Sequence, residues 1–600
     1  MEENYKQAKE DFVSGTTGSS ITHINAISLV ALTSVALYAA VQTRSRMAKS
    51  STGFFASWVL LILPMLSSMT VAAEYPRVVW LSIILAGSTG WVLRMPLVER
   101  GTPLPSSQKS PARRVTPGVG GTVDVDVGVS SGRRDGEAGW RSMHEKQRAV
   151  RLPPLPALTT YRAHMMLMTV LAILAVDFPV FPRSLAKCET FGVSLMDLGV
   201  GSFVFSQGVV SAIPLIKDPR YLRAPLIPKL LKVVRKSLPI IALGIVRVLL
   251  VKGTEYPEHV TEYGVHWNFF ITLALLPVLQ VLLHPLLACF PISNSVLGVA
   301  IGVVQQIALS EHGFGLQNYV LLAPRTSVVS MNKEGLVSLL GYLSIHLLGL
   351  STGTKVLPPT PSFYGRRQKA LAKSLDSGVG GGRKRRNSDP MDSDEEEEED
   401  VKGKLKQGSG SPTDLDLSAP RQLDKTATEL CGYSIVWWAL FGVARLTGVD
   451  GGWRRGDGGV SRRMVNISYI FWIAAFNVSF LLCYVVVLDL WIYAKGPSKA
   501  NTQKRLDKDT TPAMVEHENP PRLLEAINDY GLSVFLLANV LTGLINLSMS
   551  TMYMSDAKAM FVLSLYSMVC CAVPWFLSSN KRKRMDTSSL GVVQSENKYK

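Results

Sequence analysis

Hydrophobic residues along this chain gather into long stretches, and polar segments between them hold nearly all of the charge. About 20 consecutive apolar residues are enough for a helix to span the hydrocarbon core of a bilayer. The pattern therefore predicts an all-α polytopic membrane protein with about 13 transmembrane helices. The predicted spans are 24–42, 54–73, 76–93, 160–176, 193–216, 238–251, 266–290, 294–310, 335–353, 429–448, 464–493, 529–550 and 557–578.

Polar linkers divide these spans into three groups, at residues 1–99, 156–353 and 429–580. The linkers at 100–155 and 354–428 are rich in Gly, Ser and charged residues and lack apolar periodicity. Like-charge blocks of this kind repel each other, so we expect both linkers to be disordered. A basic tail at 581–600 follows the last group.

Composition excludes some classes of protein, and the distribution of charge predicts how the chain is oriented in the membrane. The 600 residues are 47% hydrophobic and 18% charged, with a formal net charge of +17, which excludes a cytosolic or secreted enzyme. Basic residues gather on cytoplasmic loops of membrane proteins. The basic segments 217–237 and 581–584 therefore predict a cytoplasmic C-terminus, and an odd number of spans then places the N-terminus in the lumen. The loop 449–463 disagrees, because it carries four arginines on the predicted lumenal side.

The segment with the most chemical information is the predicted lumenal loop 177–192. Asp177 stands where the fourth span ends, and Pro179 and Pro182 prevent the helix from continuing before Arg183 and Lys187. Irregular backbone at membrane depth is tolerated where it is buried in protein or lines a cavity. One carboxylate and one amine there suit binding of a polar headgroup or proton transfer from a hydroxyl. An interfacial anchor, with Lys187 reaching toward water, explains the same spacing equally well.

Other intramembrane polar residues add alternatives. Asp197 lies inside a span and is therefore a functional candidate, although the glycines around it also suit close helix packing. His266 and Asn268 begin another span on the lumenal side, and His266 is an alternative general base because its usual pKa is near neutral. Asp197 and Arg247 are also compatible with substrate groups of a multi-pass lipid or small-molecule transporter. The sequence contains no P-loop, dinucleotide fingerprint, HExxH zinc motif or His-x4-Asp acyltransferase box, and we expect no metal.

Long stretches resemble one known family. They include NYKQAKEDFVSG near the start, DFPVFPRSLAKCETFGVSLMDLGVGSFVFS around the lumenal loop, and HWNFFITLALLPVL. NKEGLVSLLGYLSIHLLGLSTG, SRRMVNISYIFWIAAFN and LLEAINDYGLSVFLLANVLTGLINLSM continue the likeness toward the C-terminus. In these segments the chain is similar to the GPI-anchored wall transfer protein family. The two charged linkers are departures that leave the matching segments intact.

This resemblance implies a multi-pass acyltransferase of the endoplasmic reticulum membrane. Such an enzyme moves a long fatty acyl chain, typically palmitoyl, from acyl-CoA to the inositol 2-hydroxyl of glucosaminyl-phosphatidylinositol, with no permanently bound cofactor. Lys187 is then the first candidate for a direct catalytic role. Asp177 would orient the lipid or share the proton transfer, and Arg183, Asp197 and Asn268 would contact substrate.

Acyl-CoA is the predicted co-substrate, and its phosphates need a cationic site. The basic residues predicted for that site are Lys229, Lys232, Arg235 and Lys236, at the cytoplasmic mouth. The positive-inside rule explains these four residues equally well. No nucleic-acid partner is expected, because most of the positive charge lies on loops where it fixes orientation.

Overall fold

The structure of the protein is a computed structural model. It describes residues 12, 14–44, 53–95, 152, 154–252, 260–290, 292–379, 417, 419–450, 459–492 and 520–596. Every regular element within these ranges is a helix. In chain order they are α2 (Ile21–Arg44), α3 (Phe54–Leu61), α4 (Leu63–Met69), α5 (Tyr75–Leu93), α7 (Pro156–Ala175), η2 (Arg183–Leu185), α8 (Leu195–Ser211), α9 (Ile213–Lys217), η3 (Tyr221–Arg223), α10 (Leu226–Lys252), α11 (Val260–Tyr263), α12 (Phe269–Leu282), α13 (His284–Cys289), α14 (Asn294–Leu309), α15 (Leu316–Leu322), α16 (Val328–Met331), α17 (Lys333–Val356), α18 (Phe363–Val379), α20 (Leu423–Leu446), α21 (Ile467–Tyr484), η4 (Val485–Ile492), α22 (Arg522–Asp529), α23 (Gly531–Ser548), η8 (Thr551–Tyr553) and α24 (Asp556–Glu596).

The chain is an all-α polytopic membrane protein, as predicted. In the described part of the chain, ten helices are long and apolar enough to cross a membrane, and two shorter apolar helices occupy Phe54–Met69 and Asn294–Leu309. A helix suits this setting because it satisfies its own backbone hydrogen bonds where no water is present. The number of thirteen spans and the side of each terminus stay predictions.

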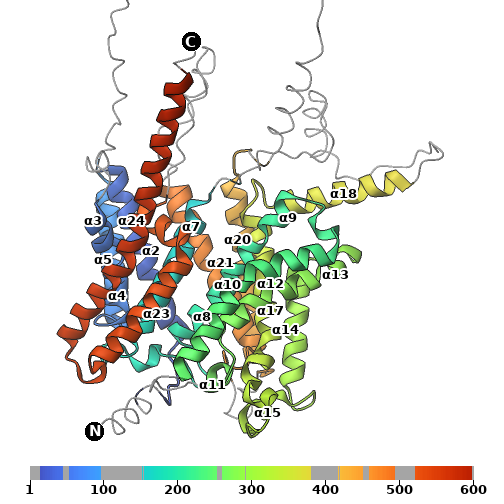
Figure 1. Cartoon of the computed structure of the whole chain (residues 1–600), viewed down its shortest axis with the longest axis horizontal. Coiled ribbons are helices and arrows are strands. Elements are labelled where there is room, and N and C mark those ends of the chain that lie inside the picture. The colour runs from blue at the N-terminus through green and yellow to red at the C-terminus, as the bar shows by residue number, and fades with distance from the viewer. Residues whose placement is uncertain are drawn as a thin grey trace, which may run out of the picture.

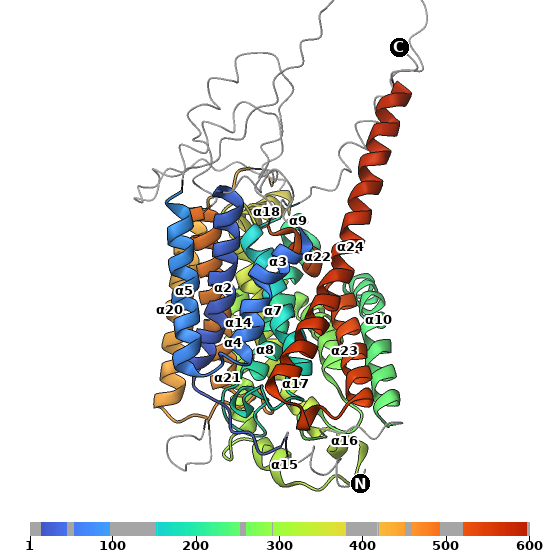
Figure 2. The same cartoon turned by 90° about the vertical axis from the view of Figure 1, so that its left-hand side faces the viewer.

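The helices form a bundle with two distinct ends (Figure 1). Helices α9 and α18 lie at one end, which we call the α18 end, and α11 and α15 lie at the other, the α11 end. Figure 2 shows the same separation from the side. The predicted cytoplasmic segments around α9 and α18 thus share one end, as the predicted topology requires.

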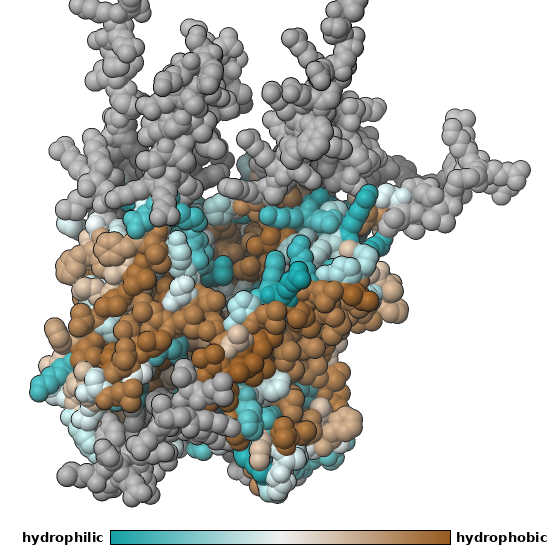
Figure 3. All heavy atoms as spheres, in the orientation of Figure 1, coloured by the Kyte–Doolittle hydropathy of each residue, from teal (hydrophilic) through white to brown (hydrophobic). Residues whose placement is uncertain are grey.

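Apolar side chains cover the outside of the bundle between these ends (Figure 3). Leu547 is 80% exposed and Phe561 is 71% exposed, on α23 and α24. Exposed side chains of this size suit contact with lipid tails, which are as apolar as leucine. Helices α7, α17 and α21 are mostly buried, and they form the interior of the bundle.

Close backbone contact between α8 and α17 builds the centre of this interior. A Cβ atom added at Gly349 of α17 would lie 2.1 Å from the carbonyl oxygen of Phe205 in α8. Only glycine therefore permits this approach, and small residues serve this purpose widely in membrane helices. The contact sets where the N-terminus of α8, with its Asp197, lies in the bundle.

Three predicted boundaries are corrected by the structure. The short predicted span 238–251 is only the second half of α10, which begins at Leu226. The predicted linker 354–428 contains the helix α18, in which Phe363 and Leu371 are buried while Arg366 and Lys369 are exposed, the spacing of an amphipathic helix. The predicted tail after residue 580 continues α24 to Glu596. Most of the linker 100–155 lies outside the described residues.

Candidate active site

The loop between α7 and α8 is irregular, as the two prolines predict, apart from the single turn η2. Arg183 holds this loop together. Its Nη2 donates to three backbone carbonyls, those of Val176 (2.7 Å), Phe178 (3.3 Å) and Phe181 (3.0 Å). Burial lowers the pKa of Arg183 to about 10, against the opposing effect of Asp177, so the guanidinium is charged at neutral pH. The predicted substrate contact of Arg183 stays a prediction, and its visible role is to brace the loop.

The N-terminal segment fixes the far side of the same loop. Ser19 N–H donates to the carbonyl of Val193 at 2.7 Å, in an isolated antiparallel bridge. Gly192 has a φ of +140°, and a Cβ there would lie 2.3 Å from the carbonyl oxygen of Thr17. Glycine is required at this position for both reasons, so the loop between α7 and α8 is tied to the start of the chain.

Asp177 is buried at the end of α7, with 2% exposure. Its Oδ2 accepts a hydrogen bond of 2.8 Å from the side-chain amide of Asn546 in α23. Thr551 donates to the amide oxygen of Asn546 at 3.2 Å, which fixes the amide with its NH₂ toward the carboxylate. The Asp177 carboxylate therefore has a fixed direction at the α11 end.

Lys187 projects from the same loop toward α11. Its Nζ lies 2.7 Å from Oε1 of Glu262, and the two side chains are 35% and 18% exposed. The structure thus gives Lys187 a carboxylate partner that the sequence did not suggest. Asp177 and Lys187, ten positions apart in the loop, are held by different helices.

Asp197 forms a buried ion pair in the first turn of α8. Its Oδ1 lies 2.5 Å from Nε of Arg462, and the side chains are 1% and 3% exposed. Its Oδ2 accepts from the backbone N–H of Cys188 at 3.0 Å, and its backbone carbonyl accepts from the Tyr469 hydroxyl at 2.7 Å. Asp197 therefore anchors the residue that follows Lys187. It stands in the first turn of α8, at a helix end, and its carboxylate is taken by Arg462 and the Cys188 N–H.

Glu262 joins these two ion pairs electrostatically. Burial acts to lower the pKa of Arg462, but the carboxylates of Asp197 and Glu262, with the nearby tyrosines, outweigh it and raise that pKa well above the usual value. The guanidinium carbon of Arg462 also lies 5.8 Å from the ring centroid of Tyr263. Lys187, Glu262, Arg462 and Asp197 therefore form a chain of alternating charge, which we call the charge chain.

Burial, followed by the effect of Asp197, raises the pKa of the Cys188 thiol. The thiolate is the nucleophilic form of cysteine. Cys188, which is 4% exposed, is therefore unsuited to form a covalent acyl intermediate.

Arg462 is followed by a second buried arginine with its own partner. Arg463 Nη2 lies 2.9 Å from Oε1 of Glu334 in α17, and Arg325 lies 2.5 Å from the same oxygen. The positive-inside rule concerns charges that stay in water on cytoplasmic loops. Arg462 and Arg463 are instead buried against carboxylates, so these two of the four arginines carry no information on the side of the membrane. Arg454 and Arg455 lie outside the described residues.

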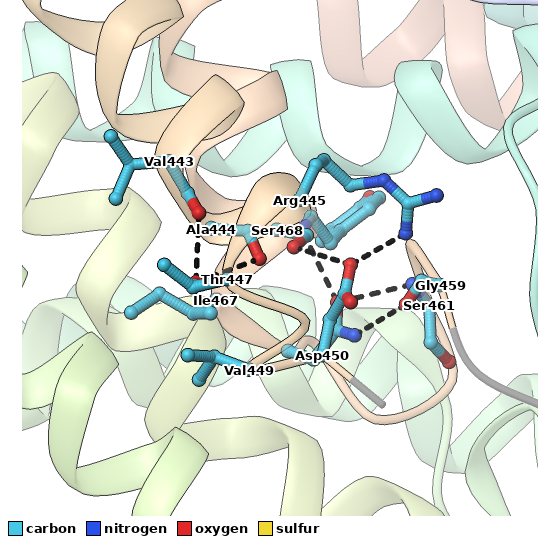
Figure 4. A network of polar contacts seen from close by, with 12 residues as sticks. Val443, Ala444, Arg445, Thr447, Val449, Asp450, Gly459, Ser461, Ile467 and Ser468 are labelled. Atoms are coloured by element: carbon cyan, nitrogen blue, oxygen red, sulfur yellow. Dashed lines mark hydrogen bonds and ion pairs between the residues drawn. The ribbon is translucent and has the colours of Figure 1, made fainter. Parts of the chain in front are cut away.

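The corner between α20 and α21 holds the loop that carries these arginines (Figure 4). Asp450 accepts from Arg445 at 2.6 Å and from the Ser468 hydroxyl at 2.8 Å. Asn466 caps α21 and donates to the carbonyl of Gly459 at 2.6 Å. The position of Arg462 is thus set by the packing of two helices.

His266 and Asn268 lie near the start of α12. The backbone N–H of His266 donates to Oδ1 of Asn332 at 2.8 Å, and its side chain is exposed. Asn268 caps α12 and donates to the carbonyl of Gly244 at 2.7 Å, so its amide joins α10 to α12. The base and substrate-binding roles of these two residues stay predictions.

The four basic residues predicted for acyl-CoA lie on α10. Lys229 is buried, and its ammonium donates to the carbonyls of Tyr221 and Leu222, each at 3.2 Å. The other three, Lys232, Arg235 and Lys236, are exposed. In Figure 3 hydrophilic side chains run obliquely across the upper half of this face, where α10 lies in Figure 1. These three residues are spaced along one helix face and present exposed cationic groups.

Sequence reasoning missed Glu262, Arg462 and Asn546 as members of the site. Each had a weaker signal: Glu262 as an acid in a predicted lumenal loop, Arg462 as a topology exception, and Asn546 as an amide inside a span. Across the described ranges, no group of three or more His, Cys, Asp or Glu side chains is arranged to hold a metal ion.

Comparison with known proteins gives consistent relatives along the whole chain. A family model for GWT1 matches residues 5–577. A protein of Cryptococcus neoformans var. neoformans serotype D is 36% identical over 668 residues, covering 97% of this chain and all of the relative. A protein of Aspergillus fumigatus is 34% identical, covering 96% and 97% of the two chains. One of Candida albicans is 31% identical, covering 97% and 99%. All three are named GPI-anchored wall transfer protein 1.

These matches extend over the α7–α8 loop, α11 and the arginine loop before α21, so they include every element of the site. With a family model matched over nearly its whole length and relatives at 31–36% identity, the chain belongs to the GWT1 family.

Proposed function

We propose that the protein is an acyltransferase of GPI-anchor biosynthesis in the endoplasmic reticulum membrane. It moves a long-chain fatty acyl group, palmitoyl, from acyl-CoA to the inositol 2-hydroxyl of glucosaminyl-phosphatidylinositol. Membership of the GWT1 family and the name of its relatives support the pathway. The observation that supports the reaction is that one irregular loop at the α11 end carries a fixed carboxylate, Asp177, held by Asn546, and a fixed ammonium, Lys187, held by Glu262.

The proposed reaction needs a group that accepts the hydroxyl proton and a group that stabilises an oxyanion. The inositol hydroxyl oxygen attacks the thioester carbonyl carbon and loses its proton, while the carbonyl oxygen becomes an oxyanion. The C–S bond then breaks, CoA leaves as the thiolate and takes up a proton, and an ester remains. A carboxylate and a cation supply proton transfer and oxyanion stabilisation, provided that both are held in place before the reaction. Asp177 orients the inositol or shares the proton transfer, and Lys187 acts directly.

Acyl-CoA approaches from the other end of the bundle in this proposal. Its phosphates are attracted by Lys232, Arg235 and Lys236 on the exposed face of α10, and the acyl chain extends among the apolar helices. Lys229 contributes less than predicted, because backbone carbonyls already take its hydrogen bonds. Attraction between exposed charges weakens with salt, so the KM for acyl-CoA rises with ionic strength.

The direct test expresses Lys187→Ala and Asp177→Ala in cells that lack the native enzyme. Microsomes are assayed for acyl-CoA-dependent acylation of the inositol lipid and for CoA release. We expect a loss of at least about 100-fold in each variant, the scale seen for a lost oxyanion or acid–base group. Lys355→Ala is the matched control, because Lys355 forms a similar pair with Glu429 at 2.8 Å near the α18 end.

Full activity of both loop variants at normal abundance would refute the assignment of the site. His266→Ala is the companion variant, and loss of turnover in that variant alone would make His266 the base. A lipid transporter would release no CoA from acyl-CoA in the presence of the inositol lipid, so CoA release in the same assay excludes that alternative.

A further inference from the structure

Glu262 contacts the side chain proposed to act on substrate, yet it lies on a different element, the short helix α11. It is less exposed than Lys187, at 18% against 35%, so the carboxylate is the inner member of the pair. The following residue, Tyr263, is 7% exposed and lies against Arg462. The buried Tyr263 holds the backbone next to Glu262, so the carboxylate is more restricted in position than that of a fully exposed glutamate.

The backbone of Lys187 is held as firmly as its side chain. Its carbonyl accepts from the hydroxyl of Thr16, and the next N–H donates to Asp197. A lysine side chain that is free in solution loses considerable rotamer entropy when substrate binding fixes it in one geometry. With both backbone sides and the ammonium restrained, Lys187 is preorganised before substrate arrives.

We propose that Glu262 is a positioning residue of the acyl transfer, which holds the ammonium of Lys187 in one direction. The inference rests on the proposed function. An ammonium has three donors and no lone pair to accept a proton. Lys187 therefore stabilises the oxyanion of the tetrahedral intermediate, and the proton of the inositol hydroxyl passes to the other fixed group of the loop, Asp177.

The charge chain explains why the carboxylate is needed. Four charged groups meet here: Lys187 and Arg462 are cations, and Glu262 and Asp197 are carboxylates. Glu262 pairs with Lys187 and acts electrostatically on Arg462, whose own ion pair is with Asp197. Without the Glu262 charge, Lys187 would lose the ion pair that holds its ammonium, and the flexible side chain would turn away toward water.

The test compares Glu262→Gln and Glu262→Asp with the wild type in the microsomal acylation assay. We expect kcat to fall at least about tenfold in Glu262→Gln, since small displacements of a reacting group have effects of this size. The KM values should stay within about twofold, and Glu262→Asp should recover part of kcat because the charge remains. Glu429→Gln is the control, because it removes the same charge from a Lys–Glu pair of similar distance, 2.8 Å, whose carboxylate is more exposed, at 37%, near the α18 end.

Two further variants separate a positioning role from a purely structural one. Glu262→Gln should add no further loss to Lys187→Ala, because a residue that acts through Lys187 has nothing left to position. Lys187→Arg should keep measurable turnover, since arginine carries a permanent charge and can still pair with Glu262.

Wild-type kcat in Glu262→Gln, with an active wild-type enzyme, would overturn the inference. It would also be overturned by an additive loss in the double variant, or by Lys187→Arg being as inactive as Lys187→Ala. A wild-type protein without acyl transfer would instead refute the proposed function, so the two failures are distinguishable.

Discussion

The buried pair of Asp197 and Arg462 gives the sharpest prediction for stability. Asp197→Asn keeps the shape of the side chain and an oxygen that can accept from Cys188 N–H, but it removes the charge opposite Arg462. Both partners are almost completely buried, at 1% and 3% exposure. Leaving one buried charge without its partner costs about 3–5 kcal/mol.

The double variant Asp197→Asn with Arg462→Met separates the charge from the packing. Methionine keeps most of the apolar stem of arginine, and no orphan charge remains. Replacing a buried pair by uncharged groups is often close to neutral, so we expect the double variant to be more stable than Asp197→Asn alone, with a coupling of about 2 kcal/mol or more.

The free energy of unfolding is measured by denaturant titration of the purified protein in mixed detergent micelles. The control is Glu74→Gln, which breaks the exposed pair of Glu74 with Arg77, 3.5 Å apart and more than 60% exposed on both sides. Exposed pairs contribute about 0–1 kcal/mol. The reasoning is refuted if Asp197→Asn loses no more stability than Glu74→Gln. It is also refuted if the losses of Asp197→Asn and Arg462→Met add up to the loss of the double variant.

Two other variants test the packing and the carboxylate of the loop. Gly349→Ala should destabilise the protein by about 1–3 kcal/mol, because the new Cβ would lie 2.1 Å from the Phe205 carbonyl oxygen. The control is Gly432→Ala in α20, whose new Cβ meets no atom within 4 Å. In the same denaturant titration the control should be neutral or stabilising. Asn546→Leu removes the 2.8 Å hydrogen bond to Asp177 and should lower kcat about tenfold with intact folding. Unchanged turnover in that variant would show that the amide does not position Asp177.

The sequence by itself determined the class of fold and the place of the irregular loop. Apolar stretches of bilayer length can satisfy their backbone only as helices, so the pattern leads directly to an all-α bundle. A proline lacks the backbone N–H and crowds the preceding turn, so Pro179 and Pro182, close together, predict that α7 ends before them. Single prolines are tolerated inside α10, α12 and α24. The boundaries of α10 and α18 were predicted less accurately. Both helices contain polar residues at helical spacing, and hydropathy alone does not detect an amphipathic helix.

Only the tertiary structure decided which charges meet. Asp197 and Arg462 are 265 residues apart, and Asp177 and Asn546 are 369 residues apart. Their contact depends on how helices pack, through close approaches such as Gly349 against α8, and no local pattern encodes that geometry. The same packing turns two arginines that contradicted the topology into buried partners of Asp197 and Glu334, since a charge in a protein interior is placed by its partner and not by the side of the membrane.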